Sequence, residues 1–441
     1  MIKVARIQNW IEKQGPVAFS IYAIFFAFMT YFCMYAFRKP FSAATFKEEA
    51  PVSLHWFGPL LEAVDYKIML IIAQVIGDML SKFFGIKYIS EVTGSARATS
   101  ILALILFAQL ALLGFAIIPP PYNILFLFLN GIPLGMVWGL VFGFLEGRRV
   151  SEALGAGLSA SYIVASGIVK TAGRMLLEAG ISPFWMPFLT GLLFLPLLGV
   201  SVFFLNQLPP PTAEDIALRT ERRPMNGEER LRFLKLYFPG LFLLTFLYMF
   251  LTAYRDFRDN FAVEIYQGLG ITDPAVFTYP EALISCIVLL MLGFLMRIKD
   301  NERALITIMV LMAAGSLLIG LGTLAFQAGL LGPVYWMILV GAGLYIGYVP
   351  YGCMLFDRMI AAIGFVGTAG FMIYVTDSFG YLGSVFLLLY KNFGGGQLSW
   401  LDFFEGFSYA TAIVCSVCFA LSAVYFHFAI VRKNRTARAA G

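Results

Sequence analysis

Two adjacent cations follow the first long apolar stretch of the sequence. The stretch from Val17 to Phe37 is almost uncharged and long enough to span a bilayer, and Arg38 and Lys39 come directly after it, before further apolar residues. A charge within a bilayer costs at least about 2.5 to 3.5 kcal/mol. Either both side chains face a wet cavity and bind an anion, or both snorkel to the membrane surface at the end of the helix.

A second group of charged residues lies at the end of a later apolar stretch. It consists of Arg255, Asp256, Arg258 and Asp259. Arg255 and Asp259 have the i, i+4 spacing, which predicts an ion pair on one face of a helix. Arg258 is then the better candidate for a ligand of an anion, and Arg255 is the second candidate.

Other charged residues lie inside apolar stretches. Asp78 and Lys82 also have the i, i+4 spacing. They either form a salt bridge that eases insertion of the helix, or Lys82 lines a cavity and is released toward a solute. Asp377 is the most isolated acid, and it is interpreted either as a partner of a nearby cation or as a proton-binding group.

A polar stripe lies in the stretch at 153–178, where Tyr162, Ser166, Lys170 and Arg174 recur every four residues. On a membrane helix such a stripe faces protein or water, so we expect these side chains to line the interior. The alternative is that Lys170 and Arg174 snorkel outward.

The composition requires a membrane protein. Hydrophobic residues make up 60% of the 441-residue chain, charged residues 13%, and the mean hydropathy is +0.82. These values exclude an ordinary soluble domain. Stretches long enough to cross a bilayer are found at residues 17–46, 65–90, 98–118, 122–145, 153–178, 183–206, 236–262, 278–297, 303–328, 333–356, 364–390 and 403–431. We therefore predict an all-α polytopic membrane protein with twelve transmembrane helices.

The placement of basic residues orients the chain. The net charge is +5, and lysines and arginines gather at both termini and in every second connection. By the positive-inside rule both termini are cytoplasmic, and the basic clusters need no nucleic-acid partner. The residues before the first stretch, Met1 to Gln14, predict a short amphipathic helix.

No group of residues predicts catalysis. All five cysteines lie in apolar stretches, and Cys415 and Cys418, which have metal-ligand spacing, lack histidine or carboxylate neighbours. The sequence contains no P-loop, nucleophile elbow or metal-binding helix. We expect no enzymatic activity, no cofactor and no metal site.

A charged, proline-containing segment from Asn206 to Lys235 divides the chain. It predicts an N-terminal six-helix bundle at 1–206, a cytoplasmic linker at 207–235 and a C-terminal six-helix bundle at 236–441, which ends in a basic cytoplasmic tail.

A weak internal repeat relates the two halves. Gly131 corresponds to Gly341, and Phe37-Arg38 corresponds to Phe257-Arg258. A pseudo-two-fold axis along the membrane normal would then bring Arg38 and Arg258 to face each other across a central cavity.

Four motifs resemble those of a known group. They are Tyr31-Phe-Cys-Met-Tyr35-Ala-Phe-Arg38-Lys39-Pro-Phe41, Ser81-Lys82-Phe83, Gly135-Met136-x-Trp138 and Phe379-Gly380-Tyr381-Leu382-Gly383. Together they resemble the organophosphate:phosphate antiporters of the major facilitator superfamily, which include glycerol-3-phosphate and hexose-phosphate carriers. The resemblance implies two pseudo-two-fold-related six-helix bundles, in a divergent bacterial branch located in the inner membrane.

The resemblance also implies roles for individual residues. In that family the first-helix arginine and its seventh-helix partner clamp the substrate phosphate, with the second-helix lysine close by. Guanidinium groups suit this task because they bind phosphate oxygens bidentately. The implied substrate-binding residues are Arg38, Arg258 or Arg255, and Lys82, with Tyr31, Tyr35 and Tyr381 lining the cavity.

We expect a monomeric secondary active transporter that moves a small anionic solute by alternating access, with a phosphate ester exchanged for phosphate. One alternative is a proton-coupled carrier of another anion or amphiphile, with Asp78 or Asp377 carrying the proton. The other alternative is a membrane sensor that binds a phosphorylated metabolite without transporting it and signals through the segment from Asn206 to Lys235.

Overall fold

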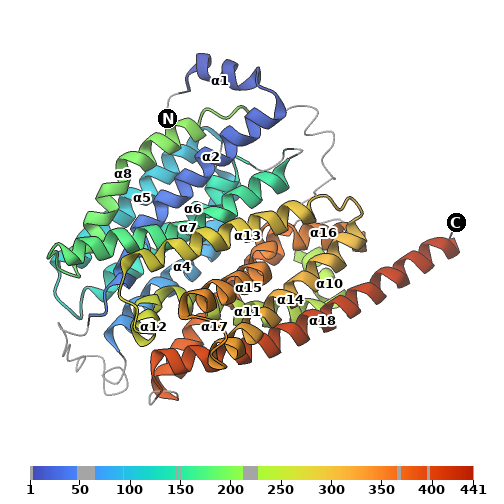
Figure 1. Ribbon diagram of the computed structural model, residues 1–441. Coiled ribbons are helices and arrows are strands. Elements are labelled where there is room, and N and C mark those ends of the chain that lie inside the picture. The colour runs from blue at the N-terminus through green and yellow to red at the C-terminus, as the bar shows by residue number, and fades with distance from the viewer. Residues whose placement is uncertain are drawn as a thin grey trace. The chain divides into compact units, whose positions relative to one another are not determined.

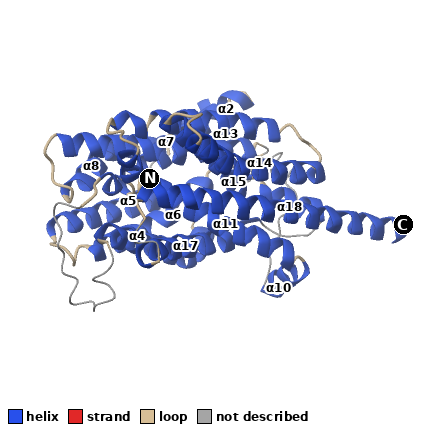
Figure 2. Cartoon of the chain, turned by 60° about the horizontal axis from the view of Figure 1, so that its bottom comes forward, coloured by secondary structure: helices blue, strands red, loops and turns tan. Residues whose placement is uncertain are grey.

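The computed structural model describes residues 3–46, 65–92, 94–145, 148, 150–211, 227–364, 369–394 and 398–440. Within these ranges the chain forms helices and loops and no β-strand (Figure 2). Ten helices of the described residues are long and apolar enough to cross a membrane. Two further helices, of 26 and 25 residues, take the places of the second and eleventh predicted spans. The prediction of twelve spanning helices is therefore confirmed.

The helices follow the predicted order along the chain (Figure 1). The spanning helices are α2 (Pro16–Met34), α4 (Tyr66–Glu91), α5 (Gly94–Ile117), α6 (Ile124–Phe142), α7 (Ser151–Glu178), α8 (Trp185–Leu205), α11 (Phe238–Asn260), α13 (Tyr279–Leu295), α14 (Asn301–Gln327), α15 (Pro333–Cys353), α17 (Ala369–Phe393) and α18 (Trp400–Ala440). The shorter elements are α1 (Ala5–Glu12), η1 (Tyr35–Phe37), η2 (Pro40–Ala43), α10 (Gly227–Leu236), α12 (Ala262–Gly268), η4 (Pro274–Phe277) and α16 (Leu355–Ile363).

The chain forms two compact units. The first unit consists of Met1–Ala217 together with two segments from the second half of the sequence, Phe257–Ala282 and Val385–Phe403. These two segments contain the ends of α11 and α17 and the starts of α13 and α18. The division into bundles at 1–206 and 236–441 stays a prediction, and residues 212–226 of the predicted linker lie outside the described residues.

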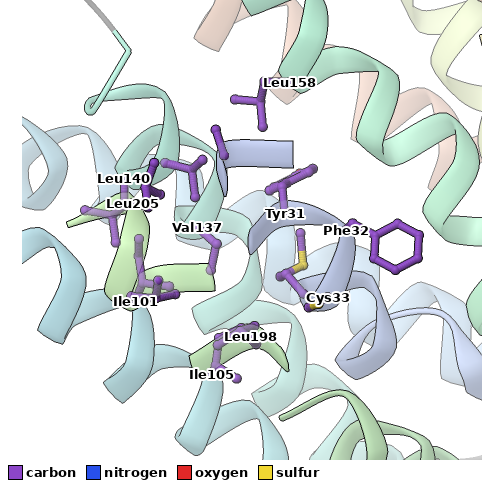
Figure 3. Packing of buried hydrophobic residues seen from close by; sticks show 14 of the residues in the cluster. Tyr31, Phe32, Cys33, Ile101, Ile105, Val137, Leu140, Leu158, Leu198 and Leu205 are labelled. Atoms are coloured by element: carbon purple, nitrogen blue, oxygen red, sulfur yellow. The ribbon is translucent and has the colours of Figure 1, made fainter. Parts of the chain in front are cut away.

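The core of the first unit is built by apolar faces of five helices. Figure 3 shows side chains of α2, α5, α6, α7 and α8 meeting there, among them Cys33, Ile105, Val137, Leu158 and Leu198, which are fully buried. Apolar packing of this kind sets the positions of the helix ends that carry the charged residues.

The first spanning helix ends earlier than the sequence predicted. The stretch at 17–46 was expected to form one span, but α2 stops at Met34, and two 3₁₀ turns, η1 and η2, follow with Arg38 and Lys39 between them. The physical reason is Pro40, which has no backbone N–H to continue the helical hydrogen bonds and whose ring crowds the carbonyl group four residues earlier.

Polar side chains of two neighbouring helices satisfy the backbone where the helix breaks. Asn130 Nδ2 donates to the Phe37 carbonyl oxygen at 3.0 Å, and Gln74 Nε2 donates to the Arg38 carbonyl oxygen at 3.0 Å. The same Gln74 amide donates to Asn130 Oδ1 at 2.8 Å. This network holds the turn that carries Arg38 and Lys39.

Other predicted boundaries also shift. The tenth span ends at Cys353, and α16 begins anew at Leu355, so Arg358 lies on a separate short helix, where it donates to Asn301 Oδ1 at 2.9 Å. The last helix is longer than the predicted span at 403–431. In both Figure 1 and Figure 2 its C-terminal end projects beyond the neighbouring helices of the second unit.

Glycines of α6 allow α4 and α6 to approach each other closely. A Cβ atom on Gly131 would meet the backbone carbonyl oxygen of Gln74, and one on Gly135 would meet the Ser81 hydroxyl. This close contact places Asp78 of α4 in the interior, where it is fully buried.

We expect Gly131→Val to destabilise the protein by about 1–3 kcal/mol, because the new side chain would have to push the two helix backbones apart. The measurement is the apparent melting temperature of the purified protein in detergent. Gly199→Val is the matched control, because a Cβ atom at that position of α8 meets no neighbouring atom within 4 Å in the described part of the chain. Equal losses in both variants would contradict the packing role.

Candidate functional site

A carboxylate at the end of α11, with a side chain that is 13% exposed, binds two lysines of the first half of the chain. Asp259 Oδ2 lies 2.7 Å from Lys39 Nζ, and Asp259 Oδ1 lies 2.6 Å from Lys170 Nζ. The Ser166 hydroxyl donates to the same Oδ1 atom. Lys39 and Lys170 are only 6% and 4% exposed. We call Lys39, Ser166, Lys170 and Asp259 the Asp259 cluster.

Each member of the cluster is positioned by its own element. Ser166 and Lys170 lie one turn apart on the same face of α7. Lys39 lies in the break between η1 and η2, and its ammonium group also donates to Asn260 Oδ1 at 2.9 Å. Lys170 additionally donates to the backbone carbonyl oxygen of Asp259 at 2.9 Å, which ties the end of α11 to α7.

The segment around η4 packs closely on α7 beside the cluster. A Cβ atom on Gly167 would overlap the Phe277 carbonyl oxygen, so only glycine admits this approach. One turn further along α7, the hydroxyl groups of Thr171 and Thr278 lie 2.9 Å apart. These contacts hold the segment Phe257–Ala282 in the first unit.

A second buried ion pair joins the same segment to α4. Lys67 Nζ lies 2.6 Å from Glu264 Oε1 and donates to the Ser42 carbonyl oxygen at 2.9 Å. Both side chains are almost fully buried, at 2% and 4% exposure. Sequence reasoning missed both residues. Lys67, which lies inside the predicted stretch at 65–90, was a signal that could have been used, whereas Glu264 lies two residues beyond the stretch at 236–262.

The two arginines of the predicted phosphate clamp each bind a carboxylate. Arg38 forms an ion pair with Asp78, which is fully buried. Arg258 Nη2 lies 2.8 Å from Glu281 Oε1. A solute anion that binds either guanidinium therefore competes with a carboxylate of the protein.

Aromatic residues adjoin the polar stripe of α7. The ring of Tyr31 lies 5.7 Å from that of Tyr35 and 5.0 Å from that of Trp138, and Trp138 lies 5.8 Å from Tyr162 (centroid distances). Figure 3 shows Tyr31 among the side chains of the apolar core. Lys82 is also buried, in α4.

The orientation predicted for the stripe holds for Ser166 and Lys170, which point into the protein, so the snorkelling alternative is wrong for Lys170. Arg174, one turn further, is partly exposed and lies 3.4 Å from Glu178.

The second unit contains a polar cluster of its own. Arg255 Nη2 lies 2.7 Å from Asp256 Oδ1, and the Arg255 guanidinium also donates to the Tyr348 hydroxyl. Ser384 Oγ donates to Asp256 Oδ2 at 2.7 Å. Among the predicted site residues, this unit also contains Tyr381, which is buried.

Asp377 of the second unit accepts a hydrogen bond from the Tyr248 hydroxyl at 2.8 Å. This contact is compatible with either predicted role of Asp377, the ion-pair partner or the proton-binding group.

The predicted ion pair between Arg255 and Asp259 needs correction. Asp259 binds Lys39 and Lys170, while Arg255 binds the adjacent Asp256. The physical reason is that two ammonium groups, one on each carboxylate oxygen, neutralise Asp259 more fully than a single side chain of its own helix would.

The charges of the Asp259 cluster do not cancel. Two ammonium groups share one carboxylate, so the cluster keeps a net positive charge in a buried place. Electrostatic attraction is strong there because the effective dielectric constant is low. Two buried ammonium groups of this kind can bind an anionic group, and in this structure they bind the carboxylate of Asp259.

Three solved structures that are similar to this chain are those of transporters. A D-xylose-proton symporter is similar over 93% of this chain and 97% of its own, with 15% identity and a TM-score of 0.60. Two POT family transporter structures, in complex with a thioalcohol conjugated peptide and with 5-aminolevulinic acid, have TM-scores of 0.57 and 0.56 at 14% identity. Both cover 92% of this chain and 96% of their own. The predicted major facilitator fold is confirmed.

Comparison with curated proteins finds no match. The sequence does match the model of a family of unknown function, DUF5690, over residues 40–428, which is most of its length. The organophosphate antiporter group stays a prediction. The chain belongs to the family DUF5690.

Proposed function

We propose that this protein is a secondary active transporter that moves a small anionic solute across the membrane by alternating access. The observation that carries the proposal is the Asp259 cluster, in which two buried lysines hold one carboxylate. The solute's anionic group binds the two ammonium groups in place of Asp259.

Fold stability alone does not account for such a cluster. Burying charged groups costs several kcal/mol per ion, and replacing a buried ion pair with apolar residues is often neutral or stabilising. Ionisable residues inside membrane proteins accordingly mark pathways for solutes and ions. The first unit contains several, including Arg38, Lys39, Lys67 and Lys170.

The transporters with the same fold support this proposal. One of them is a D-xylose-proton symporter, and the other two are structures of a POT family transporter in complex with small molecules. In transporters with internal repeats the substrate site lies near the middle of the membrane, and alternating access proceeds by rocking of the repeats around it.

The specific reaction we propose is exchange of a phosphate ester for phosphate in a bacterial inner membrane, by a monomer with both termini in the cytoplasm. The motifs around Arg38, Lys82 and Tyr381 favour this reaction. Arg38 and Arg258 are proposed to bind the phosphate once it displaces Asp78 and Glu281 from them.

A second candidate is a proton-coupled carrier of another anion. The observation that favours it is Asp78, a fully buried carboxylate that binds Arg38. Protonation of Asp78 would release Arg38 toward a solute. This candidate predicts uptake that a proton gradient drives without any solute on the opposite side.

The test of the proposed exchange uses purified protein in proteoliposomes. Vesicles are filled with unlabelled phosphate, labelled phosphate is added outside, and its entry is measured against vesicles without protein. Saturable, protein-dependent exchange is expected. If the protein exchanges no phosphate, phosphate-linked antiport is refuted, and the search moves to other anions under a proton gradient.

A further inference from the structure

We infer that the Asp259 carboxylate serves as an internal substitute for the transported anion, so that the carrier can reorient without cargo and its exchange is not obligatory. This inference rests on the proposed function and specifies how the same site is regulated.

The first step of the argument is the geometry of the carboxylate. Its two oxygens bind different lysines, at 2.7 Å from Lys39 and 2.6 Å from Lys170, and the Ser166 hydroxyl completes the site. A solute carboxylate or phosphate would use the same two ammonium groups and the same hydroxyl donor. The protein thus contains, as part of its own chain, an anion that fits the solute site.

The second step is where this anion comes from. Asp259 belongs to the segment Phe257–Ala282 of the second half of the sequence, whereas both lysines belong to the first half. The segment is held in the first unit by the Lys67–Glu264 ion pair and by its packing on α7 at Gly167. The packing of this segment in the first unit therefore brings the Asp259 carboxylate to Lys39 and Lys170.

The third step concerns how the carrier reorients across the membrane when no solute is bound. A carrier whose cationic site has no anion resists closing, because closure would bury two ammonium groups without compensation. Such a carrier is an obligatory exchanger. With Asp259 between Lys39 and Lys170, each ammonium group has a carboxylate oxygen when the site closes without cargo. This partial compensation makes reorientation of the empty carrier, and so net transport in one direction, possible.

The experiment compares two fluxes of labelled phosphate in proteoliposomes: exchange, with unlabelled phosphate inside, and net uptake, with none inside. The wild type is expected to show both. In Asp259→Asn, the ratio of net uptake to exchange should fall by at least about tenfold relative to wild type, because an amide carries no negative charge to compensate the ammonium groups when the site closes without cargo.

Two variants serve as controls. Asp259→Glu keeps the carboxylate and should restore net uptake. Asp273→Asn removes a carboxylate of the same segment that lies outside the cluster, where it caps η4, and should leave the ratio of the two fluxes unchanged.

The possible outcomes separate this inference from the proposed function. Wild-type protein that exchanges phosphate but shows no net uptake overturns the inference and leaves the transporter proposal intact, and this arm needs no variant to fold. An unchanged flux ratio in Asp259→Asn also overturns it. Wild-type protein with neither flux overturns the phosphate-linked function, and the inference with it.

Discussion

Replacing Arg38 by lysine is expected to remove most transport, although the positive charge is kept. A lysine offers a compact ammonium group and loses the planar, bidentate geometry by which a guanidinium binds a phosphate or carboxylate. Losing one charge-assisted hydrogen bond costs about 1.5–3 kcal/mol, so we expect exchange to fall about ten- to a hundredfold. Labelled phosphate exchange in proteoliposomes measures the effect.

The control for this prediction is Arg174→Lys. Arg174 lies on the polar stripe of α7, but it is partly exposed and paired with Glu178 at the helix end. Its replacement should leave exchange unchanged. Arg258→Lys should resemble Arg38→Lys, and normal exchange in both variants would refute the assignment of these arginines to a phosphate clamp.

Replacing Glu264 by alanine is expected to destabilise the protein strongly. Lys67 is almost fully buried, and removal of its carboxylate partner leaves a buried charge without compensation from that residue. Breaking a buried ion pair from one side costs about 3–5 kcal/mol. We therefore expect a large drop in the apparent melting temperature of the detergent-purified protein.

The double variant Lys67→Met with Glu264→Leu distinguishes this mechanism from a simple packing defect. Apolar residues of similar volume remove both charges together, so the double variant should recover most of the lost stability. Glu178→Gln, which weakens the half-exposed pair with Arg174, should change stability by about 1 kcal/mol or less. A double variant as unstable as Glu264→Ala would contradict the role of the uncompensated lysine.

The spanning helices could be predicted from the sequence because the bilayer imposes a simple local rule. A helix needs about twenty consecutive apolar residues to cross the hydrocarbon layer, and every backbone polar group there has to be satisfied within the helix. This rule also predicted that the stripe with Ser166 and Lys170 faces inward. The break after α2 was not predicted, although Pro40, which follows Arg38 and Lys39 directly, was a signal in the sequence.

The partners of the charged residues were not predictable in the same way. The i, i+4 rule finds only ion pairs within one helix, and for Arg255 and Asp259 it proposed the wrong pair. The actual pairs join residues far apart in sequence, such as Lys39 with Asp259 and Lys67 with Glu264. These contacts depend on which helix ends lie next to each other. That arrangement results from the packing of many apolar helix faces together.

The sequence by itself therefore determined that this is a helical membrane protein with twelve spans and with cations at the ends of its first and seventh spans. Only the tertiary structure decided that Asp259 binds Lys39 and Lys170 and that Lys67 has a buried partner. The physical reason is that hydrophobicity acts residue by residue along the chain, whereas a buried charge is stabilised by the groups that packing brings within a few ångströms of it.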